Sequence, residues 1–364
     1  MRAIRSSTVI DPHQFDFNLF EKILEEDHAD FPVSAREWSF ILPININLEL
    51  LKSGLRAKIN SRLFVVTDSE FVKGVFYDLQ TKCGNQIELQ LDKRQLKADW
   101  PAFIVFKSFG RTIHHAFAEA ADDLWAFRGM LELSYGGLAT VINIQNEPIR
   151  AFRIESWAIA LSGGGYDYVP IGLQQSTWNY EDGQLRQSKR FDDRSMKYFR
   201  WLRASVRRSR PKEIGSLLYR CFVLYADVVD QVWDIDQFLH LWRIAETITL
   251  SEKSGGSTDV VCNRFAIYMK MDGLSEGDVV RSLQGLARVR NKWVHQGLPE
   301  GADQHINNEF RTGCVNAILW LSRQLGRISS ENDLDKWYSY HNVNNKDLKS
   351  IQDMASLVLE SRKS

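Results

Sequence analysis

The sequence predicts an α+β protein with a mixed α/β sheet domain over residues 1–180, an all-α helical bundle over 186–330 and a helical extension over 331–364. Segments rich in aromatic and β-branched residues, which favour strands, are concentrated before residue 180. Beyond residue 186, apolar residues recur mainly at helical spacing. A polar run at 181–184 marks the boundary. The length of 364 residues, with 44% hydrophobic and 25% charged residues, fits a globular protein of about two domains.

The first domain is predicted to be a sheet with one long helix packed on it. Strand-like segments occupy residues 38–42, 63–67, 72–79, 87–91, 102–106, 138–144, 150–161 and 166–170, and a short helix is expected over 15–26. The long helix is predicted over 113–133, because the apolar residues in this segment follow a helical period. Its apolar face comprises Phe117, Ala121, Leu124, Phe127 and Leu131, and its polar residues include Glu119, Asp122, Asp123 and Arg128.

Several features of this domain could suggest a ligand site, but each has a simpler interpretation. The glycine groups at 135–137 and 163–165 lack the residues of a phosphate loop or a dinucleotide fingerprint, so hairpin turns are expected there. His114 and His115 have no carboxylate or cysteine at ligand spacing, which favours surface histidines over a metal site. We also find no serine-hydrolase elbow and no zinc-protease motif. The sequence therefore predicts neither a metal nor a cofactor.

Charge and cysteine usage limit the partners and the compartment. The 46 Lys and Arg residues balance 46 Asp and Glu residues, so a nucleic acid would have to be held by a local basic patch. The cysteines at 83, 221, 262 and 314 are far apart and fit a reducing compartment. The N-terminus lacks the apolar region of a signal peptide, and no segment approaches the ~20 apolar residues of a membrane span. A cytoplasmic protein without a membrane partner is expected.

A basic stretch over 186–210 opens the helical domain. Cations at 190, 194, 197, 200 and 203 keep helical spacing, and aromatic residues between them supply a packed side. Such a helix can follow a phosphate backbone, in which case the RNA-binding residues would be Arg194, Lys197, Arg200, Arg203, Arg207 and Arg208. A solvated helix face that balances acidic residues elsewhere explains the same pattern. The sequence leaves both interpretations open.

Further helices are predicted over 213–230, 235–250, 260–269, 307–325 and 348–359. The last of these is amphipathic and is expected to pack on the domain or on a second chain. Between them lies a helix that contains Arg290. Ser275 and Asp278 resemble the capping box that starts a helix, and Gly297 followed by Pro299 ends it.

Two charged residues occupy positions where helix packing would favour apolar side chains. Val279, Leu283 and Leu286 form an apolar stripe whose next position is Arg290. In the same way, Glu246 falls between Trp242 and Thr249 on the face of an earlier helix. A charge that faces a core is costly unless it is paired, so Glu246 and Arg290 are predicted to lie near each other or to line one polar pocket.

The segment Arg290-Asn291-Lys292-Trp293-Val294-His295 resembles the hallmark of the HEPN superfamily of small helical domains. That hallmark is an Arg, usually followed by Asn, and then a His after three to five further residues. The upstream segments, from Phe238 to Glu246 and from Asn263 to Ala266, resemble the Apea-like branch of this superfamily. The resemblance covers roughly residues 190–330.

This resemblance implies a metal-independent endoribonuclease without a cofactor. His295 would serve as the acid and base, Arg290 would hold the phosphate, and Asn291 and Glu246 would complete the catalytic set. It also implies a homodimer through the HEPN domain and a role in phage defence or as a toxin. An antitoxin or a trigger protein would then be a partner, and the N-terminal domain would sense the trigger or restrain the nuclease.

Other functions remain open. The helical domain could be a noncatalytic RNA- or protein-binding module, with Glu246 and Arg290 fixing helix register and His295 capping a helix. A toxin modified by a partner nucleotidyltransferase is a further alternative. Helix geometry bears on the catalytic hypothesis, because Arg290 and His295 are five positions apart and therefore point about 140° apart around one helix axis. Fraying near Gly297, or a two-fold dimer with a shared cleft, would bring the two groups to one phosphate.

Overall fold

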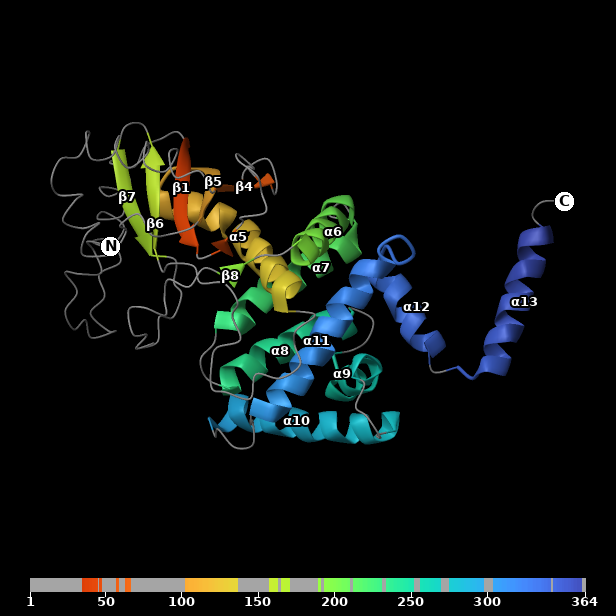
Figure 1. Ribbon diagram of the computed structural model, residues 1–364. Helices are drawn as coiled ribbons and strands as arrows, with labels where there is room; N and C mark the ends of the chain where they lie inside the picture. Colours follow the sequence, from red (N-terminus) through yellow and green to blue (C-terminus); the bar gives the residue numbers. More distant parts are fainter. Residues whose placement is uncertain are drawn as a thin grey trace, which may run out of the picture. The chain divides into compact units, whose positions relative to one another are not determined.

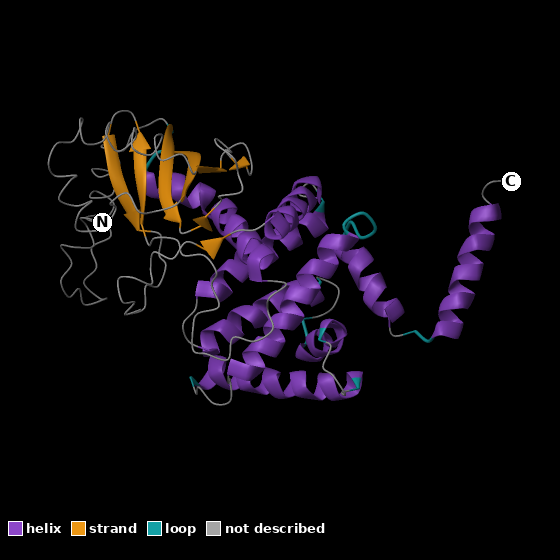
Figure 2. Ribbon diagram, in the orientation of Figure 1, coloured by secondary structure: helices purple, strands orange, loops and turns teal. Residues whose placement is uncertain are grey.

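The computed structural model describes residues 35–44, 46–47, 57–58, 63–66, 102–136, 157–162, 165–170, 189–190, 193–209, 212–230, 234–251, 256–269, 275–297, 304–341 and 343–361. The described residues combine a β-sheet with many helices, which is an α+β architecture (Figure 2). The expected helix at 15–26 and the expected strands at 72–79, 87–91 and 138–144 lie outside these residues.

The chain divides into two compact units. One, the sheet unit, comprises Met1–Pro43, Gly54–Ala121 and Glu155–Gly172, and the other, the helical unit, comprises Ile44–Ser53, Asp122–Ile154 and Leu173–Ser364. The sequence places the whole helix at 113–133 in the first domain and separates residues 331–364 from the helical bundle. The observed division instead assigns the second half of that helix, and residues 331–364, to the helical unit.

Among the described residues, the sheet unit contains a six-stranded sheet in the order β3-β4-β5-β1-β6-β7 (Figure 1). The strands are β1 (Arg36–Ile44), β3 (Ala57–Lys58), β4 (Leu63–Val66), β5 (Ala102–Gly110), β6 (Trp157–Ser162) and β7 (Gly165–Pro170). The pairs β3/β4, β4/β5, β1/β6 and β6/β7 are antiparallel. Ser162 pairs with Gly165, which closes the β6/β7 hairpin expected at the second glycine group.

Helix α5 (Ile113–Gly136) begins on this sheet. Phe117 contacts the rings of Phe40 and Phe106, whose own rings stack with centroids 4.8 Å apart. Ala116 lies so close to Gly110 that a Cβ at residue 110 would be 2.4 Å from the Ala116 nitrogen. The glycine at the end of β5 therefore allows the helix to start close to the strand.

The second half of α5 is covered on all sides, so that Arg128, which the pattern placed off the apolar face, is fully buried. The hairpin turn expected at the first glycine group is wrong, because Tyr135 and Gly136 belong to the helix. Gly129 shows how closely this half packs, since a Cβ there would lie 2.0 Å from the backbone oxygen of Phe222 in the helical unit.

The helical unit contains α6 (Asp193–Ser209), α7 (Glu213–Asp230), α8 (Asp234–Thr249), α9 (Thr258–Phe265), the short helix η3 (Ala266–Tyr268), α10 (Glu276–Gln296), α11 (Gln304–Gln324), α12 (Glu331–His341) and α13 (Asn345–Ser361). Helices α7 and α8 form a hairpin, and α11 packs against α8, α6 and α7 (Figure 1). Helix α10 packs on α9 and η3. On α13, the apolar side chains Ile351, Met354 and Val358 are exposed.

The basic stretch is not entirely helical. Lys189 and Arg190 form the two-residue strand β8, which pairs in parallel with β2 (Ile46–Asn47) in the helical unit. Helix α6 starts only at Asp193, where an acidic residue interacts favourably with the positive end of the helix dipole. Arg190 therefore does not belong to the predicted helical row of cations.

Aromatic residues form much of the core of the helical unit. Phe265 contacts Phe310 of α11, and Trp242 of α8 stacks on Phe310 with centroids 5.7 Å apart. A second group fixes α12, with Trp337 4.1 Å from Trp320 between ring centroids. These contacts form a rigid frame around the C-terminal half of α8, from which Glu246 projects.

Candidate functional site

Helix α10 carries the Arg290 motif and is defined at both ends by its own residues. Ser275 and Asp278 form the predicted capping box, each side chain accepting the backbone N–H of the other residue. Gly297 ends the helix with φ 67°, a left-handed conformation that glycine adopts without strain. The buried stripe comprises Val279, Leu283 and Ala287, whereas Leu286 is only half-buried. Arg290 continues this stripe one turn beyond Ala287.

Glu246 and Arg290 lie together, as their positions in two apolar stripes predict. Arg290 Nη2 is 3.4 Å from Glu246 Oε1, and each side chain is 30% exposed. The same carboxylate oxygen accepts a hydrogen bond of 2.8 Å from Nε1 of Trp242. Because the Trp242 ring is buried against Phe310, it holds Glu246 in a fixed direction. The guanidinium thus has an oriented counter-charge and still reaches solvent.

Asn291 brings the guanidinium toward the side of the helix that carries the histidine. Arg290 Nη1 donates to Asn291 Oδ1 at 3.0 Å. Around an ideal helix, Asn291 lies about 100° and His295 about 140° from Arg290 in the same direction. The long arginine side chain therefore places its guanidinium nearer to the side of His295 than the roughly 140° between the two residues suggests.

His295 lies in the last turn of α10 and is exposed. The helix continues regularly to Gln296, so the fraying that would have turned His295 toward Arg290 is not observed. Among the described residues, none is hydrogen-bonded or ion-paired to its imidazole. The structure thus brings together Glu246, Arg290 and Asn291, and leaves His295 separate on the neighbouring surface.

The predicted RNA-binding residues form a separate basic surface. The cations Arg194, Lys197, Arg200, Arg207 and Arg208 of α6 are exposed, and Arg203 is half-buried. Burial, and then the neighbouring charges of Arg207 and Arg200, lower the pKa of Arg203 from its ordinary value. Figure 1 shows α6 and α10 at opposite ends of the helical unit. The basic surface is therefore separate from the Arg290 motif on α10.

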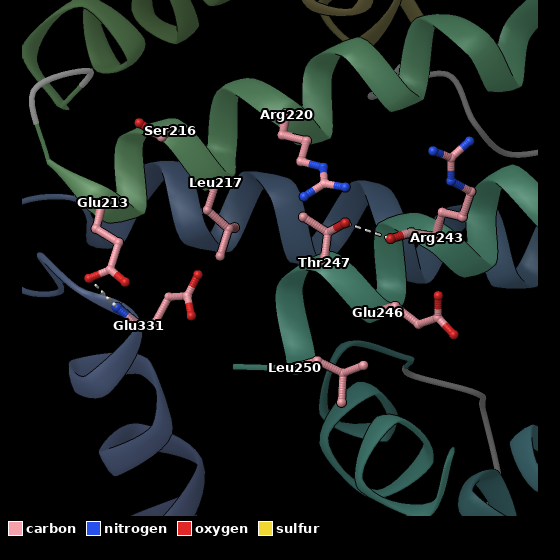
Figure 3. A pocket seen from close by; sticks show the side chains of 9 residues that line it. All are labelled: Glu213, Ser216, Leu217, Arg220, Arg243, Glu246, Thr247, Leu250 and Glu331. Carbon is pink, nitrogen blue, oxygen red and sulfur yellow. Dashed lines mark hydrogen bonds between the residues drawn. The ribbon is translucent and has the colours of Figure 1, made fainter. Parts of the chain in front are cut away.

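A polar pocket of about 470 Å³ lies beside Glu246 (Figure 3). Helices α7, α8 and α12 supply its lining, which consists of Glu213, Ser216, Leu217, Arg220, Arg243, Glu246, Thr247, Leu250 and Glu331. Nothing in the sequence singles out Arg220 and Arg243, because each occupies an ordinary polar position on an amphipathic helix. The hydrogen bond between Trp242 and Glu246 could have been predicted from the sequence, because residues four positions apart on a helix are neighbours.

The three cysteines of the described residues, Cys221, Cys262 and Cys314, are buried. Burial raises the pKa of the Cys221 thiol to about 12 and that of Cys262 to about 11, and it also raises the pKa of Cys314. Arg264, in the second family-like segment, donates to Thr249 O and Asp335 Oδ1, both at 2.6 Å, and so connects α9, α8 and α12. Its role is structural.

The described parts of the chain contain no group of three or more His, Cys, Asp or Glu residues arranged to hold a metal ion. Within the same residues, no helix has both the length and the apolar character needed to cross a membrane. Comparison of the chain with protein-family models, with curated proteins and with solved structures gives no match.

Proposed function

We propose that this protein is a metal-independent endoribonuclease of the HEPN type, with its catalytic site on α10. The observation that carries the proposal is the set of contacts around Arg290. A guanidinium held by Glu246 and Asn291, and still 30% exposed, is prepared to bind a phosphate without first being ordered. The Apea-like resemblance of the surrounding sequence supports the same assignment.

The chemistry requires a base, an acid and a phosphate-binding group. His295 takes the proton from a ribose 2′-hydroxyl, whose oxygen attacks the adjacent phosphorus while the bond to the 5′-oxygen breaks. The resulting imidazolium returns the proton to the leaving 5′-oxygen. Arg290 binds the non-bridging oxygens, which carry the developing charge. The products are a 2′,3′-cyclic phosphate and a 5′-hydroxyl, and DNA is not a substrate because it lacks the internal nucleophile.

A noncatalytic RNA- or protein-binding module is the second candidate, and the environment of His295 favours it. No described residue orients the imidazole, whereas catalytic histidines usually have a partner that fixes the tautomer. In this alternative, the Glu246–Arg290 pair only fixes the register of α8 and α10. RNA binding would then depend on the basic surface of α6.

The biological setting follows from the same proposal. A HEPN nuclease of this kind would act as a cytoplasmic homodimer in phage defence or as a toxin. An antitoxin or trigger protein would control it, and the sheet unit would sense the trigger or restrain the nuclease.

The test is cleavage of single-stranded RNA by the full chain in the presence of EDTA. Wild-type protein should produce 2′,3′-cyclic phosphate ends, and His295→Ala should lower the rate by about 10²- to 10⁴-fold. His114→Ala is the matched control, since His114 lies at the start of α5 in the sheet unit, away from the motif. Equal rates for wild type and His295→Ala, or loss of wild-type cleavage in EDTA, would contradict the proposal. RNA binding without cleavage, unaffected by His295→Ala, would favour the module.

A further inference from the structure

The pocket beside Glu246 has different charged groups at its two ends. Arg220 of α7 and Arg243 of α8 lie at one end together with Thr247 and Glu246, and only the acidic residues Glu213 and Glu331 are charged at the other (Figure 3). Only Leu217 and Leu250 contribute apolar side chains to the lining. The arrangement favours a ligand that is itself polar, with different chemistry at its two ends.

The two arginines provide the positive end. Both are exposed, and within the described residues neither guanidinium has a hydrogen bond or an ion pair. Because α7 and α8 form a hairpin and both side chains line the same pocket, the two cations flank one space. Guanidinium groups present rigid, paired donors that match phosphate oxygens, so a phosphate group could bind to both of them.

The opposite end accepts hydrogen bonds. Glu213 already accepts the backbone N–H of Glu331 at 3.4 Å, which keeps its carboxylate at the pocket wall. Glu331 supplies a second carboxylate to the same end of the lining. Carboxylate oxygens here suit hydroxyl or amino donors, and they would repel a second phosphate.

We propose that this pocket binds a small phosphate ester of the size of a nucleoside monophosphate, with its phosphate between Arg220 and Arg243 and its hydroxyl or amino donors toward Glu213 and Glu331. The volume of about 470 Å³ lies in the range of small-molecule sites. A continuous RNA strand fits less well, because the acidic end would oppose the next phosphate of the chain.

The ligand would also be linked to the Arg290 site. Glu246 lines the pocket, and the same carboxylate holds Arg290 at 3.4 Å. An anion bound beside Arg243 changes the electric field at Glu246, so occupancy of the pocket alters the affinity of Arg290 for its substrate. Substrate bound at Arg290 then alters the affinity of the pocket for its ligand by the same factor. This regulatory part rests on the proposed ribonuclease function, whereas ligand binding itself does not.

Calorimetry on the full chain tests binding directly, with adenosine 5′-monophosphate, guanosine 5′-monophosphate, inorganic phosphate and adenosine as probes. At least one nucleotide should bind at millimolar concentration or below, and more tightly than phosphate or adenosine. Arg220→Gln and Arg243→Gln should each weaken binding about tenfold or more, the effect expected for losing one charge-assisted hydrogen bond. Arg327→Gln, an exposed arginine outside the pocket, should bind like wild type.

Three results would overturn the proposal. These are no binding of either nucleotide, binding no tighter than that of phosphate or adenosine, and equal binding by the double variant Arg220→Gln/Arg243→Gln. Displacement of the nucleotide by single-stranded RNA in proportion to RNA length would assign the pocket to RNA and overturn it as well.

The His295→Ala protein separates this proposal from the ribonuclease. It should bind the nucleotide like wild type even though it does not cleave RNA, and failure of the nuclease assay leaves the calorimetric result unaffected. If wild type does cleave RNA, saturating nucleotide should change its rate, and the double variant Arg220→Gln/Arg243→Gln should lack that response. An unchanged wild-type rate would refute the link while leaving the binding site in place.

Discussion

Arg290 and His295 lie on one unbroken helix, and their side chains leave its axis about 140° apart. Asn291 holds the guanidinium on the side nearer to His295, but no described interaction brings the imidazole to it. A second chain related by two-fold symmetry would place a histidine opposite this arginine. The first prediction tests that geometry.

Light scattering should give about twice the chain mass if the motif helices face each other in a two-fold dimer. Co-expressed Arg290→Ala and His295→Ala chains should then recover about a quarter of wild-type cleavage, because half of the dimers are mixed and each mixed dimer has one complete trans site. Each variant expressed alone is the control and should be inactive. No recovery in the mixed sample, or a monomer that cleaves RNA at the wild-type rate, would rule out a trans site.

Glu246→Gln should lower RNA cleavage far more than it lowers stability. The amide oxygen still accepts the Trp242 N–H, but the charge that holds Arg290 is removed. Because both side chains are about a third exposed, the free energy of unfolding should fall by about 1 kcal/mol or less. Urea unfolding and initial cleavage rates measure the two effects. Asp353→Asn, an exposed carboxylate on α13, is the control for an exposed acid-to-amide change.

The basic surface of α6 predicts salt-dependent RNA binding. Replacing Arg200 and Arg208 with Gln should weaken binding, and the slope of log affinity against log salt should fall by about 0.7 for each phosphate that is no longer neutralised. Filter binding over a range of salt concentrations measures the slope. The control variant Lys346→Gln/Lys349→Gln removes two exposed cations from α13. Equal slopes for the two double variants would identify α6 as a solvated face.

The capping box of α10 predicts a loss of stability in acid. Hydrogen bonds from the side chain and backbone of Ser275 lower the pKa of Asp278 below its ordinary value of 3.8. A lowered folded-state pKa means that ionised Asp278 stabilises the fold above the ordinary pKa, and that this contribution is lost as the pH falls through the lowered value.

The measurement for this prediction is the free energy of unfolding of wild type and Asp278→Asn. Wild type should be the more stable near pH 7, and the difference should shrink toward about pH 2. A difference independent of pH would mean that the cap acts without the charge. Because Asp278 begins the helix that carries Arg290, the variant also shows whether the start of α10 contributes to RNA binding.

The sequence by itself was enough to predict the helices that end in local signals. The bounds predicted for α7 are those observed, and the ends of α10 follow from Ser275, Asp278 and Gly297. These signals act through hydrogen bonds between residues close in the chain, so they can be read without a fold. The pairing of Glu246 with Arg290 was also predictable, because an unpaired charge in an apolar stripe is costly.

Tertiary structure decided what depends on contacts between distant segments. The pattern of α5 showed no sign that Arg128 is fully buried, because its burial depends on which helices cover that face. Strand β8 forms only because Ile46 and Asn47 supply a partner for Lys189 and Arg190. The pocket end that holds Arg220 and Arg243 exists because a hairpin aligns two polar positions that are 23 residues apart. Sequence periodicity shows which face of a helix is polar, and only packing determines which other polar groups that face meets.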